Sequence, residues 1–300
     1  MRRRPFAAAS AALLLAIVPV LSGCAAEEEE EPPAEVVVTG EPGVAPDLQY
    51  PVPLVVDASR VEVIWAGQGP EVQEGEPILV NYYAEAGADA SLVGETFSSE
   101  PKPYLLSAEA LGTEIFRALE GRTVGSRILQ VVPPEEGQTS STVAVFDLLP
   151  TRASGEVVPP REGLPAVETA DDGSPTISVP AQEPPDELVV QPLIRGTGRQ
   201  VEPGQVITVQ YTGVRWSDGT VFDSSWGAGK LPAPFPIGVG SVIEGWDTGL
   251  VEQTVGSQVL LVIPPSLGYG GTDDELAGET LVFVVDILAA SGGPASSEAS

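Results

Sequence analysis

Residues 205–213 read Gln-Val-Ile-Thr-Val-Gln-Tyr-Thr-Gly, and residues 281–288 read Leu-Val-Phe-Val-Val-Asp-Ile-Leu. In the first stretch Ile207, Val209 and Tyr211 alternate with polar side chains, which predicts a strand with one buried face. The second stretch is rich in Val and Ile and is predicted to form another strand. Residues 259–263 are apolar at every position, as expected of a central strand that is covered on both faces.

One short helix is predicted between these strands. Ile243, Trp246 and Leu250 recur at helical spacing, and Asp247 lies near the start of that turn, where the helix dipole favours an acidic residue. Several strands around one short helix predict a β-rich α+β domain.

The pattern occurs twice along the chain. Seven residues of the first copy recur 129 positions later: Gly67, Gly69, Val72, Gly75, Ile78, Val80 and Tyr82 match Gly196, Gly198, Val201, Gly204, Ile207, Val209 and Tyr211. Residues 123–126 and 254–257 both read Thr-Val-Gly-Ser, at an offset of 131. Two tandem domains of about 100 residues are therefore predicted, at 49–150 and 188–290.

Five aromatic residues follow one another in a fixed order in the second copy, although only 6% of the chain is aromatic. They lie in the segments Gln210-Tyr211-Thr212-Gly213, Val221-Phe222-Asp223-Ser224-Ser225, Val242-Ile243-Glu244-Gly245-Trp246, Gly268-Tyr269-Gly270 and Leu281-Val282-Phe283. This set resembles the hydrophobic pocket of the FKBP-type peptidyl-prolyl cis-trans isomerases, over about 100 residues. The resemblance implies a twisted antiparallel β-sheet wrapped over a short α-helix, in two tandem copies.

The resemblance also implies a role for each residue. Trp246 would form the floor under the proline ring, and Tyr269 would offer its hydroxyl to a substrate carbonyl. Asp223 would orient the twisting amide and act electrostatically rather than as a base. The remaining substrate-binding positions are the walls and the rim: Tyr211, Phe222 and Phe283, then Val242 and Ile243, the last through its backbone N–H.

Such a site needs no cofactor and no metal. Rotation about an X-Pro bond crosses a barrier of about 18–20 kcal/mol, at the top of which the amide has lost its resonance. An apolar pocket favours this twisted, less polar state over the planar amide.

A purely structural interpretation applies to several of the apolar residues, and we expect Phe235, Ile237, Leu281 and Val285 to be core. Phe222 to Ser225 also reads as a strand end followed by an Asp-stabilised turn. Two departures from the family thin the expected pocket wall: Ala233 replaces an aromatic residue, and the loop 272–276 is short and acidic, with Leu276 as its one apolar side chain.

The first copy keeps the framework but lacks most of the pocket. Tyr82 and Phe97 persist, whereas Ser98 is matched to Asp223. Ile115 or Phe116 falls at the Trp246 position, and Ala144 falls opposite Phe283. We therefore predict a degenerate FKBP-like domain without isomerase activity.

The N-terminus predicts a lipoprotein signal over residues 1–23. Arg2, Arg3 and Arg4 precede an apolar stretch too short to span a membrane, which ends in Leu-Ser-Gly before Cys24. Lipid on the Cys24 thiol would anchor the protein outside the cytoplasm. Acidic, Pro-rich residues 24–48 are predicted to be a tether, 151–187 a linker with a short extended piece at 176–179, and 291–300 a disordered tail.

Composition excludes several classes of function. The chain has no His and one Cys, so it has no Ser-His-Asp triad, imidazole metal site or intramolecular disulfide. Its net charge of −29 disfavours nucleic acid. The expected partners are proline-containing segments of exported proteins, macrolide ligands and a membrane reached through the lipid. A chaperone-like module that binds proline peptides without turnover is the alternative function. A solute-binding lipoprotein would need two α/β lobes, against which the β-rich repeat argues.

Overall fold

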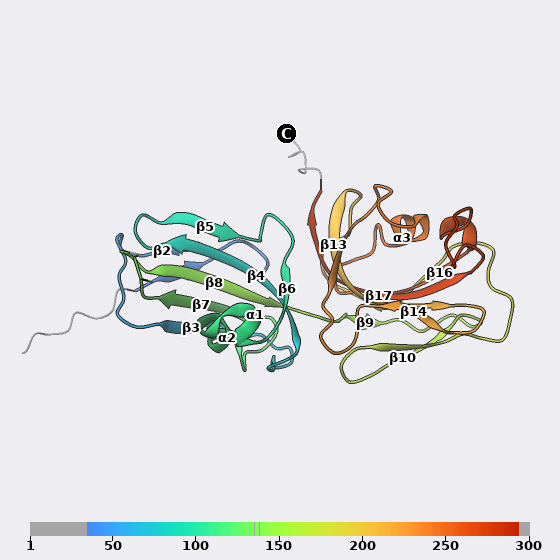
Figure 1. Cartoon of the computed structure of the whole chain (residues 1–300), viewed down its shortest axis with the longest axis horizontal. Helices are drawn as coiled ribbons and strands as arrows, with labels where there is room; N and C mark the ends of the chain where they lie inside the picture. Colours follow the sequence, from blue (N-terminus) through green and yellow to red (C-terminus); the bar gives the residue numbers. More distant parts are fainter. Residues whose placement is uncertain (1–34, 135, 138, 294–300) are drawn as a thin grey trace, which may run out of the picture. The chain divides into compact units, whose positions relative to one another are not determined.

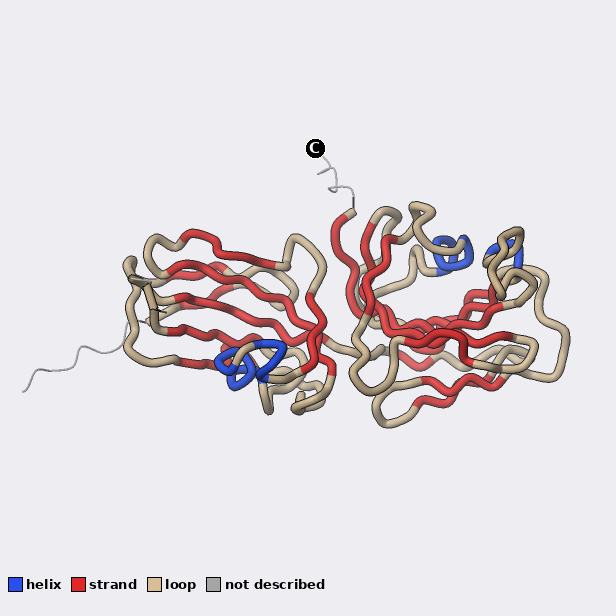
Figure 2. Tube along the Cα trace, viewed as in Figure 1, coloured by secondary structure: helices blue, strands red, loops and turns tan. Residues whose placement is uncertain are grey.

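The structure is a computed structural model that describes residues 35–134, 136–137 and 139–293. Each copy of the repeat forms its own antiparallel sheet, and helices are few and short (Figures 1 and 2). The predicted α+β class, with an antiparallel sheet and a short helix in each of two copies, is confirmed.

The first sheet has the strand order β3-β7-β8-β4-β5, with β6 pairing beside β5 on the same edge of β4. Its strands are β3 (Arg60–Trp65), β4 (Pro77–Ala86), β5 (Ser91–Glu95), β6 (Lys102–Leu105), β7 (Arg127–Val132) and β8 (Thr142–Leu149). Two helices, α1 (Ala108–Leu111) and α2 (Thr113–Leu119), lie between β6 and β7 in the chain.

Both faces of the first sheet are covered. One face, which includes Ile128 and Leu148, packs against the fully buried Leu119 of α2. The other face, which includes Val131 and Val145, packs against Val36 and Leu54 from the segment that precedes the sheet. Within that segment β1 (Val37–Thr39) and β2 (Asp47–Gln49) form an antiparallel hairpin. The tether predicted for 24–48 is therefore wrong from residue 36 onward, because Val36, Val38 and Leu48 pack against the sheet.

The second sheet has the order β14-β13-β17-β16-β12-β9, with β15 also pairing to β13. Its strands are β9 (Glu156–Val157), β12 (Val189–Arg195), β13 (Gln205–Arg215), β14 (Val221–Ser224), β15 (Ala233–Pro236), β16 (Gln258–Ile263) and β17 (Leu281–Gly292). The helix α3 (Glu244–Gly249) and the 3-10 turn η1 (Pro265–Leu267) complete the domain.

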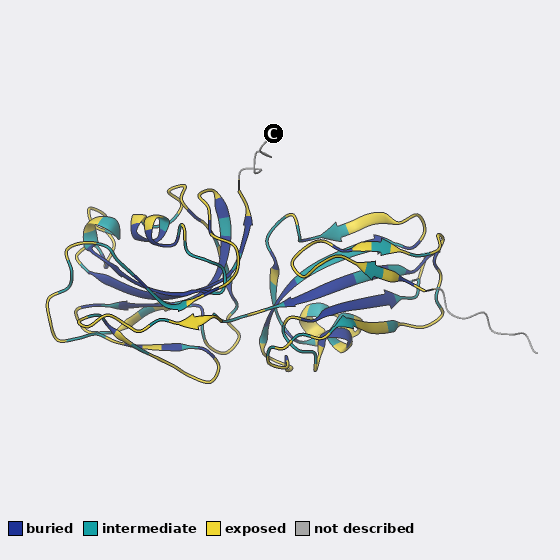
Figure 3. Cartoon of the chain, turned by 180° about the vertical axis from the view of Figure 1, so that it is seen from behind, coloured by how far each residue is buried: buried dark blue, intermediate teal, exposed yellow. Residues whose placement is uncertain are grey.

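Side chains of β16 and β17 alternate between the two faces of this sheet, as the period of a strand requires. Leu261 and Phe283 belong to the cluster that packs on α3, whereas Leu260 and Val284 belong to the cluster on the opposite face. Every residue of β16 is buried, as predicted for 259–263 (Figure 3).

The opposite face is covered by a hairpin from the predicted linker. Strands β10 (Ala166–Thr169) and β11 (Pro175–Ser178) pair with each other, and Ile177 is buried beside Val214 and Val262. The extended piece predicted at 176–179 is confirmed. The interpretation of 151–187 as a simple linker is wrong, because this segment supplies part of the second domain's core.

The remaining N-terminal predictions, the signal at 1–23 and Cys24, lie outside the described residues. The disordered tail predicted for 291–300 is wrong at residues 291 and 292, since β17 continues to Gly292, and residues 294–300 lie outside the described residues. In the part of the chain that the structure describes, no helix is both long and apolar enough to cross a membrane.

Candidate active site

The short helix α3 sets one side of the site. It begins after Ile243, and Gly245 lies so close to β16 that an added Cβ would stand 2.5 Å from Ile263. This glycine lets the helix approach the sheet and turns Trp246 into the cluster, where the indole is only 4% exposed. The helix predicted from Ile243, Trp246 and Leu250 is confirmed.

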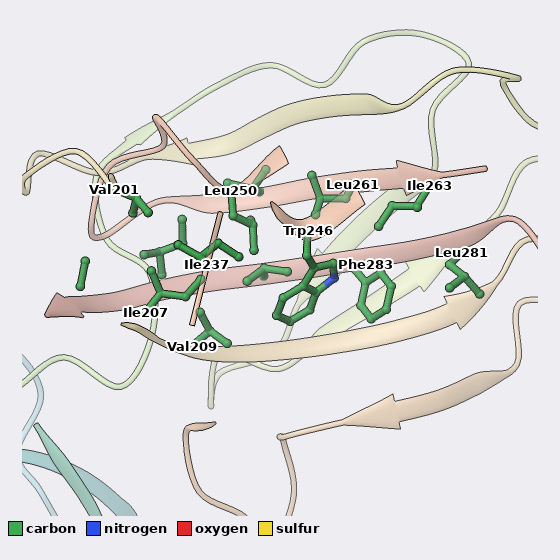
Figure 4. Packing of buried hydrophobic residues seen from close by; sticks show 14 of the residues in the cluster. Val201, Ile207, Val209, Ile237, Trp246, Leu250, Leu261, Ile263, Leu281 and Phe283 are labelled. Carbon is green, nitrogen blue, oxygen red and sulfur yellow. The ribbon is translucent and has the colours of Figure 1, made fainter. Parts of the chain in front are cut away.

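Three aromatic rings surround the indole of Trp246. The ring centroids of Tyr211, Phe235 and Phe283 lie 5.4, 5.1 and 5.3 Å from it, each at an interplanar angle of 69° or more. Such edge-to-face packing is the arrangement that aromatic quadrupoles favour. Trp246 and Phe283 project from α3 and β17 into the same space (Figure 4). The site is therefore an aromatic enclosure built from helix and sheet together.

Phe222 extends this enclosure through Phe283. The two ring centroids are 5.4 Å apart and the rings are perpendicular. Gly213 lies beneath both rings, and a Cβ there would meet each of them at 2.7 Å. A glycine near the end of strand β13 thus leaves room for two phenylalanines.

Asp223 and Tyr211 form the polar edge of the site. The Tyr211 hydroxyl donates a 2.6 Å hydrogen bond to Oδ2 of Asp223. Partial burial, then the hydrogen bond to Asp223 and its charge, raise the pKa of Tyr211 well above its ordinary value. The carboxylate is therefore held in place by a phenol that stays protonated.

Tyr269 follows the 3-10 turn η1 and packs partly buried against the same cluster. Its pKa is also raised, first by burial and then by the charges of Asp274 and Asp223. Its ring therefore lies within electrostatic reach of two carboxylates.

The indole N–H of Trp246 is buried, and no described residue accepts a hydrogen bond from it. Figure 4 shows the indole nitrogen on the side of the ring that faces Phe283. The floor of the site therefore carries one unused hydrogen-bond donor within otherwise apolar surroundings.

Asp247 holds the loop that precedes the helix. Its two carboxylate oxygens accept the N–H groups of Gly238 (2.8 Å) and Gly240 (2.5 Å). The same loop leads to Val242 and Ile243, which pack partly buried on the core. Sequence reasoning assigned Asp247 only to the helix dipole, because a contact back to a loop leaves no periodic signal.

The structure brings the sequence-predicted residues of this domain together. Seven of them lie in or against one cluster: Tyr211, Phe222, Val242, Ile243, Trp246, Tyr269 and Phe283. Asp223 joins through its hydrogen bond to Tyr211. Cys24, the predicted lipid-bearing residue, lies outside the described residues.

Phe235 was predicted to be core, and it does pack on the core cluster, but it also forms part of the enclosure. Its ring lies 5.8 Å from Tyr211 as well as 5.1 Å from Trp246. Phe235 lies on a short strand, and the sequence pattern there does not distinguish a residue that lines the site from one that only fills the core. Ile237, Leu281 and Val285 are fully buried, as predicted.

Comparisons with known proteins agree with this geometry. A family model described as FKBP-type peptidyl-prolyl cis-trans isomerase matches residues 197–288. The FK506-binding protein of Streptomyces anulatus is 40% identical over 119 residues, which cover 38% of this chain and 95% of that relative. The chain belongs to the FKBP-type peptidyl-prolyl cis-trans isomerase family.

Further matches are of the same kind. The probable FK506-binding protein of Corynebacterium glutamicum is 38% identical over 118 residues, covering 39% of this chain and 98% of the relative. Among solved structures, FkpA from Escherichia coli is 32% identical with a TM-score of 0.33, covering 45% of this chain and 54% of that one. The structure of the three FKBP domains of wheat FKBP73 is 21% identical with a TM-score of 0.32, covering 78% and 94%.

The first FKBP-like repeat lacks the equivalent of Asp223. Strand register pairs Gly213 with Asp223 in the second repeat, and Ala84 with Gly94 in the first. Gly94 therefore stands where Asp223 does, and the match of Ser98 to Asp223 predicted from sequence is wrong. The motif Phe-Ser-Ser at 97–99 resembles Phe-Asp-Ser at 222–224, but the hydrogen-bonded ladder, not the motif, fixes the alignment.

Two other losses in the first repeat agree with the prediction. Ala144 pairs with Ala84 as Phe283 pairs with Gly213, so an alanine replaces this wall. Leu119 ends α2 and Leu250 directly follows α3, and both leucines are fully buried. Counting back four residues from each of them matches Ile115 to Trp246.

Proposed function

We propose that the second FKBP domain catalyses cis-trans isomerisation of X-Pro bonds in the aromatic enclosure around Trp246. The observation that carries the proposal is the convergence of Trp246, Phe283 and the Tyr211–Asp223 pair in one cluster of a member of this family. The proline ring would rest on the indole. An enclosure lined by apolar aromatic rings would favour the twisted amide, which is less polar, over the planar one.

Asp223 would act in this mechanism as a fixed charge beside the amide. A carboxylate already hydrogen-bonded to Tyr211 needs no rearrangement when the substrate arrives, which makes it an orienting and electrostatic group. Tyr269 would donate its hydroxyl to a substrate carbonyl, and the Ile243 N–H would bind the extended chain. No proton leaves or joins the substrate.

The first FKBP-like domain would have no isomerase activity of its own. It lacks counterparts of Asp223, Trp246 and Phe283, so neither a floor nor a fixed carboxylate is available there. We propose that it serves as an accessory that spaces the active domain or contacts clients.

The place of action would be the outer face of a membrane. Residues 1–24, with three arginines, an apolar stretch and Leu-Ser-Gly-Cys, support a lipid anchor on Cys24. Clients would then be exported proteins. A Cys24→Ala variant should leave the membrane fraction and lose acyl labelling, whereas labelling that persists would contradict the anchor.

We further propose that the enclosure binds FK506, the ligand after which both bacterial relatives are named. If so, FK506 should compete with a Leu-Pro peptide for the full chain. Undiminished isomerisation at saturating FK506 would exclude this ligand without touching the isomerase proposal.

The experiment that tests the function is isomerisation of a short Leu-Pro peptide by the full chain. Wild type should accelerate the exchange, and Trp246→Leu should remove most of that acceleration because the ring that receives proline is gone. Leu250→Ile, a volume-conserving change at the same helix, controls for loss of packing. Peptide binding without acceleration by wild type would favour the chaperone-like alternative.

A further inference from the structure

The loop between Tyr269 and β17 is fixed at the rim of the site. The Tyr269 carbonyl accepts hydrogen bonds from the Thr272 N–H (3.1 Å) and hydroxyl (2.7 Å). Farther along the loop, Leu276 is only 7% exposed in the cluster that contains Trp246 and Phe283. Both ends of residues 272–276 are therefore tied to residues of the proposed pocket.

Asp274 is held at the outer edge of this loop. Its Oδ1 accepts the Leu276 N–H at 2.9 Å, and its own N–H donates to the Thr272 hydroxyl at 3.2 Å. The side chain is nevertheless exposed to solvent. A carboxylate in this position has a fixed place and remains accessible to a bound peptide.

Asp274 and Asp223 act on the same ring from two different elements. Both charges raise the pKa of Tyr269, although burial is the larger cause. One carboxylate lies on strand β14 and the other on the 272–276 loop, so negative charge flanks Tyr269 on two segments of the rim.

Two cations of this domain have other partners than Asp223 and Asp274. Arg215 forms its ion pair with Glu275 at 3.2 Å, and Lys230 donates to the Ser224 carbonyl at 2.5 Å. Within residues 188–293, eleven acidic residues stand against four basic ones. No ion pair of Asp223 or Asp274 is found among the described residues.

We propose that this site selects proline segments with a lysine or arginine next to the proline, and that Asp274 sets the selection. The inference rests on the proposed isomerase function and narrows its substrate class. A cation next to a proline that rests on Trp246 would lie beside Tyr269, close to two carboxylates that form no ion pair among the described residues. An acidic neighbour is repelled there.

The size of the effect follows from exposure. Charges at an open rim interact weakly and are screened by salt, so a preference of about five- to tenfold is expected at low ionic strength. It should shrink towards unity near 1 M salt, where the Debye length is about 3 Å.

The test uses three peptides that differ only in the residue before proline, Lys, Leu or Glu, and a second set with the change after proline. We would measure kcat/KM with the full chain, at low and high salt, for wild type and Asp274→Asn. Asp172→Asn is the matched control, because Asp172 likewise accepts the N–H two residues on, from Ser174, on the hairpin that covers the opposite sheet face.

Wild type should favour Lys over Glu about five- to tenfold in at least one set, Asp274→Asn should reduce the ratio to about twofold, and Asp172→Asn should leave it unchanged. A ratio near one in wild type, or one that Asp274→Asn does not alter, would overturn the proposal. Equal losses for all three peptides would give Asp274 a structural role only. Leu-Pro turnover reports separately: if wild type lacks it, the isomerase proposal itself fails.

Discussion

The hydroxyl of Tyr211 on β13 and the carboxylate of Asp223 on β14 are joined by a 2.6 Å hydrogen bond across neighbouring strands. The two residues are diagonal rather than directly opposite, since Asp223 pairs in register with Gly213. Diagonal neighbours on one face are within reach of a long side chain such as tyrosine. The sheet itself therefore fixes the carboxylate at the edge of the aromatic cluster.

Loss of this bond should impair catalysis more than stability. In Tyr211→Phe we expect kcat/KM for a Leu-Pro peptide to fall about tenfold, the value of one hydrogen bond to a charged group. Tyr82→Phe is the matched control, because Tyr82 faces Gly94 instead of an aspartate. Equal effects of the two variants would show that the Asp223 contact is irrelevant to the reaction.

Gly213 provides a second test of the pocket walls. In Gly213→Ala the new methyl would overlap the rings of Phe222 and Phe283, each 2.7 Å from its position. Displacement of both rings should lower kcat/KM by tenfold or more and cost about 1–3 kcal/mol of stability. We would measure turnover and thermal unfolding on the same samples.

The first repeat offers the reciprocal control for that change. Its counterpart of Gly213 is Ala84, which faces Ala144 instead of a phenylalanine. Ala84→Gly should weaken its strand by about 0.5–1 kcal/mol and leave turnover unaltered. Unchanged turnover in Gly213→Ala would mean that Phe222 and Phe283 are not walls of the reacting site.

Much of this architecture could be predicted from the sequence. The apolar run at 259–263 and the helical spacing around Trp246 report burial within single elements, and both predictions were correct. The alternation in 205–213 correctly predicted a strand, but the prediction of a single buried face was wrong, because Thr208 and Gln210 on the other face are buried as well. The order of the aromatic residues then predicted the site, because the resemblance to one family specifies which side chains meet.

The sequence did not predict contacts between segments that are distant in the chain, because such contacts depend on the packing partner and not on the local pattern. Pro- and Glu-rich composition hid the two covering hairpins, since two buried residues, Pro175 and Ile177, suffice to anchor a strand whose other two residues are polar and exposed. The mismatch of Ser98 with Asp223 has the same origin, because register is set by a ladder between strands. Asp247 acts on a loop behind it, which no periodicity reveals.

The hairpin β10–β11 should therefore count as part of the second domain. Ile177→Ala removes a buried side chain from the sheet's outer face and should lower the unfolding free energy by about 2 kcal/mol or more. Thr176→Ala, the exposed neighbour on the same strand, should change it by less than about 0.5 kcal/mol. Similar changes in unfolding free energy for the two variants would indicate that 151–187 is a linker and not part of the domain.

Asp286 gives this domain a defined pH dependence. Its carboxylate accepts hydrogen bonds from the Ala153 N–H (2.7 Å) and the Gln258 side chain (2.8 Å), but the matched position in the first repeat, Asp147, is paired with Arg127 at 2.6 Å. Burial raises the pKa of Asp286 to about 6, and the two hydrogen bonds and the charge of Arg152 oppose only part of the shift.

Because this pKa is raised on folding, the stabilisation from Asp286 is fully present below about pH 4 and is lost as pH rises through about 6. In urea unfolding, the stability of wild type relative to Asp286→Asn should fall by about 2 kcal/mol between pH 4.5 and 7.5. Because the two proteins share all their other carboxyl groups, the contributions of those groups cancel in this difference. A difference that is flat across this range would contradict the assignment.

The central claim is that proline binds and turns over on Trp246 in the second domain. The most direct measurement follows the indole N–H resonances of the full, nitrogen-15-labelled chain while a Leu-Pro peptide exchanges between cis and trans. Trp65, whose indole donates to the Gly125 carbonyl at 3.1 Å, reports on the first repeat in the same spectrum. We predict that added peptide shifts the Trp246 indole resonance and leaves the Trp65 resonance in place. We also predict that the peptide exchanges between cis and trans faster with the protein than without it. Accelerated exchange with an unmoved Trp246 resonance, or with a shift confined to Trp65, would contradict the account.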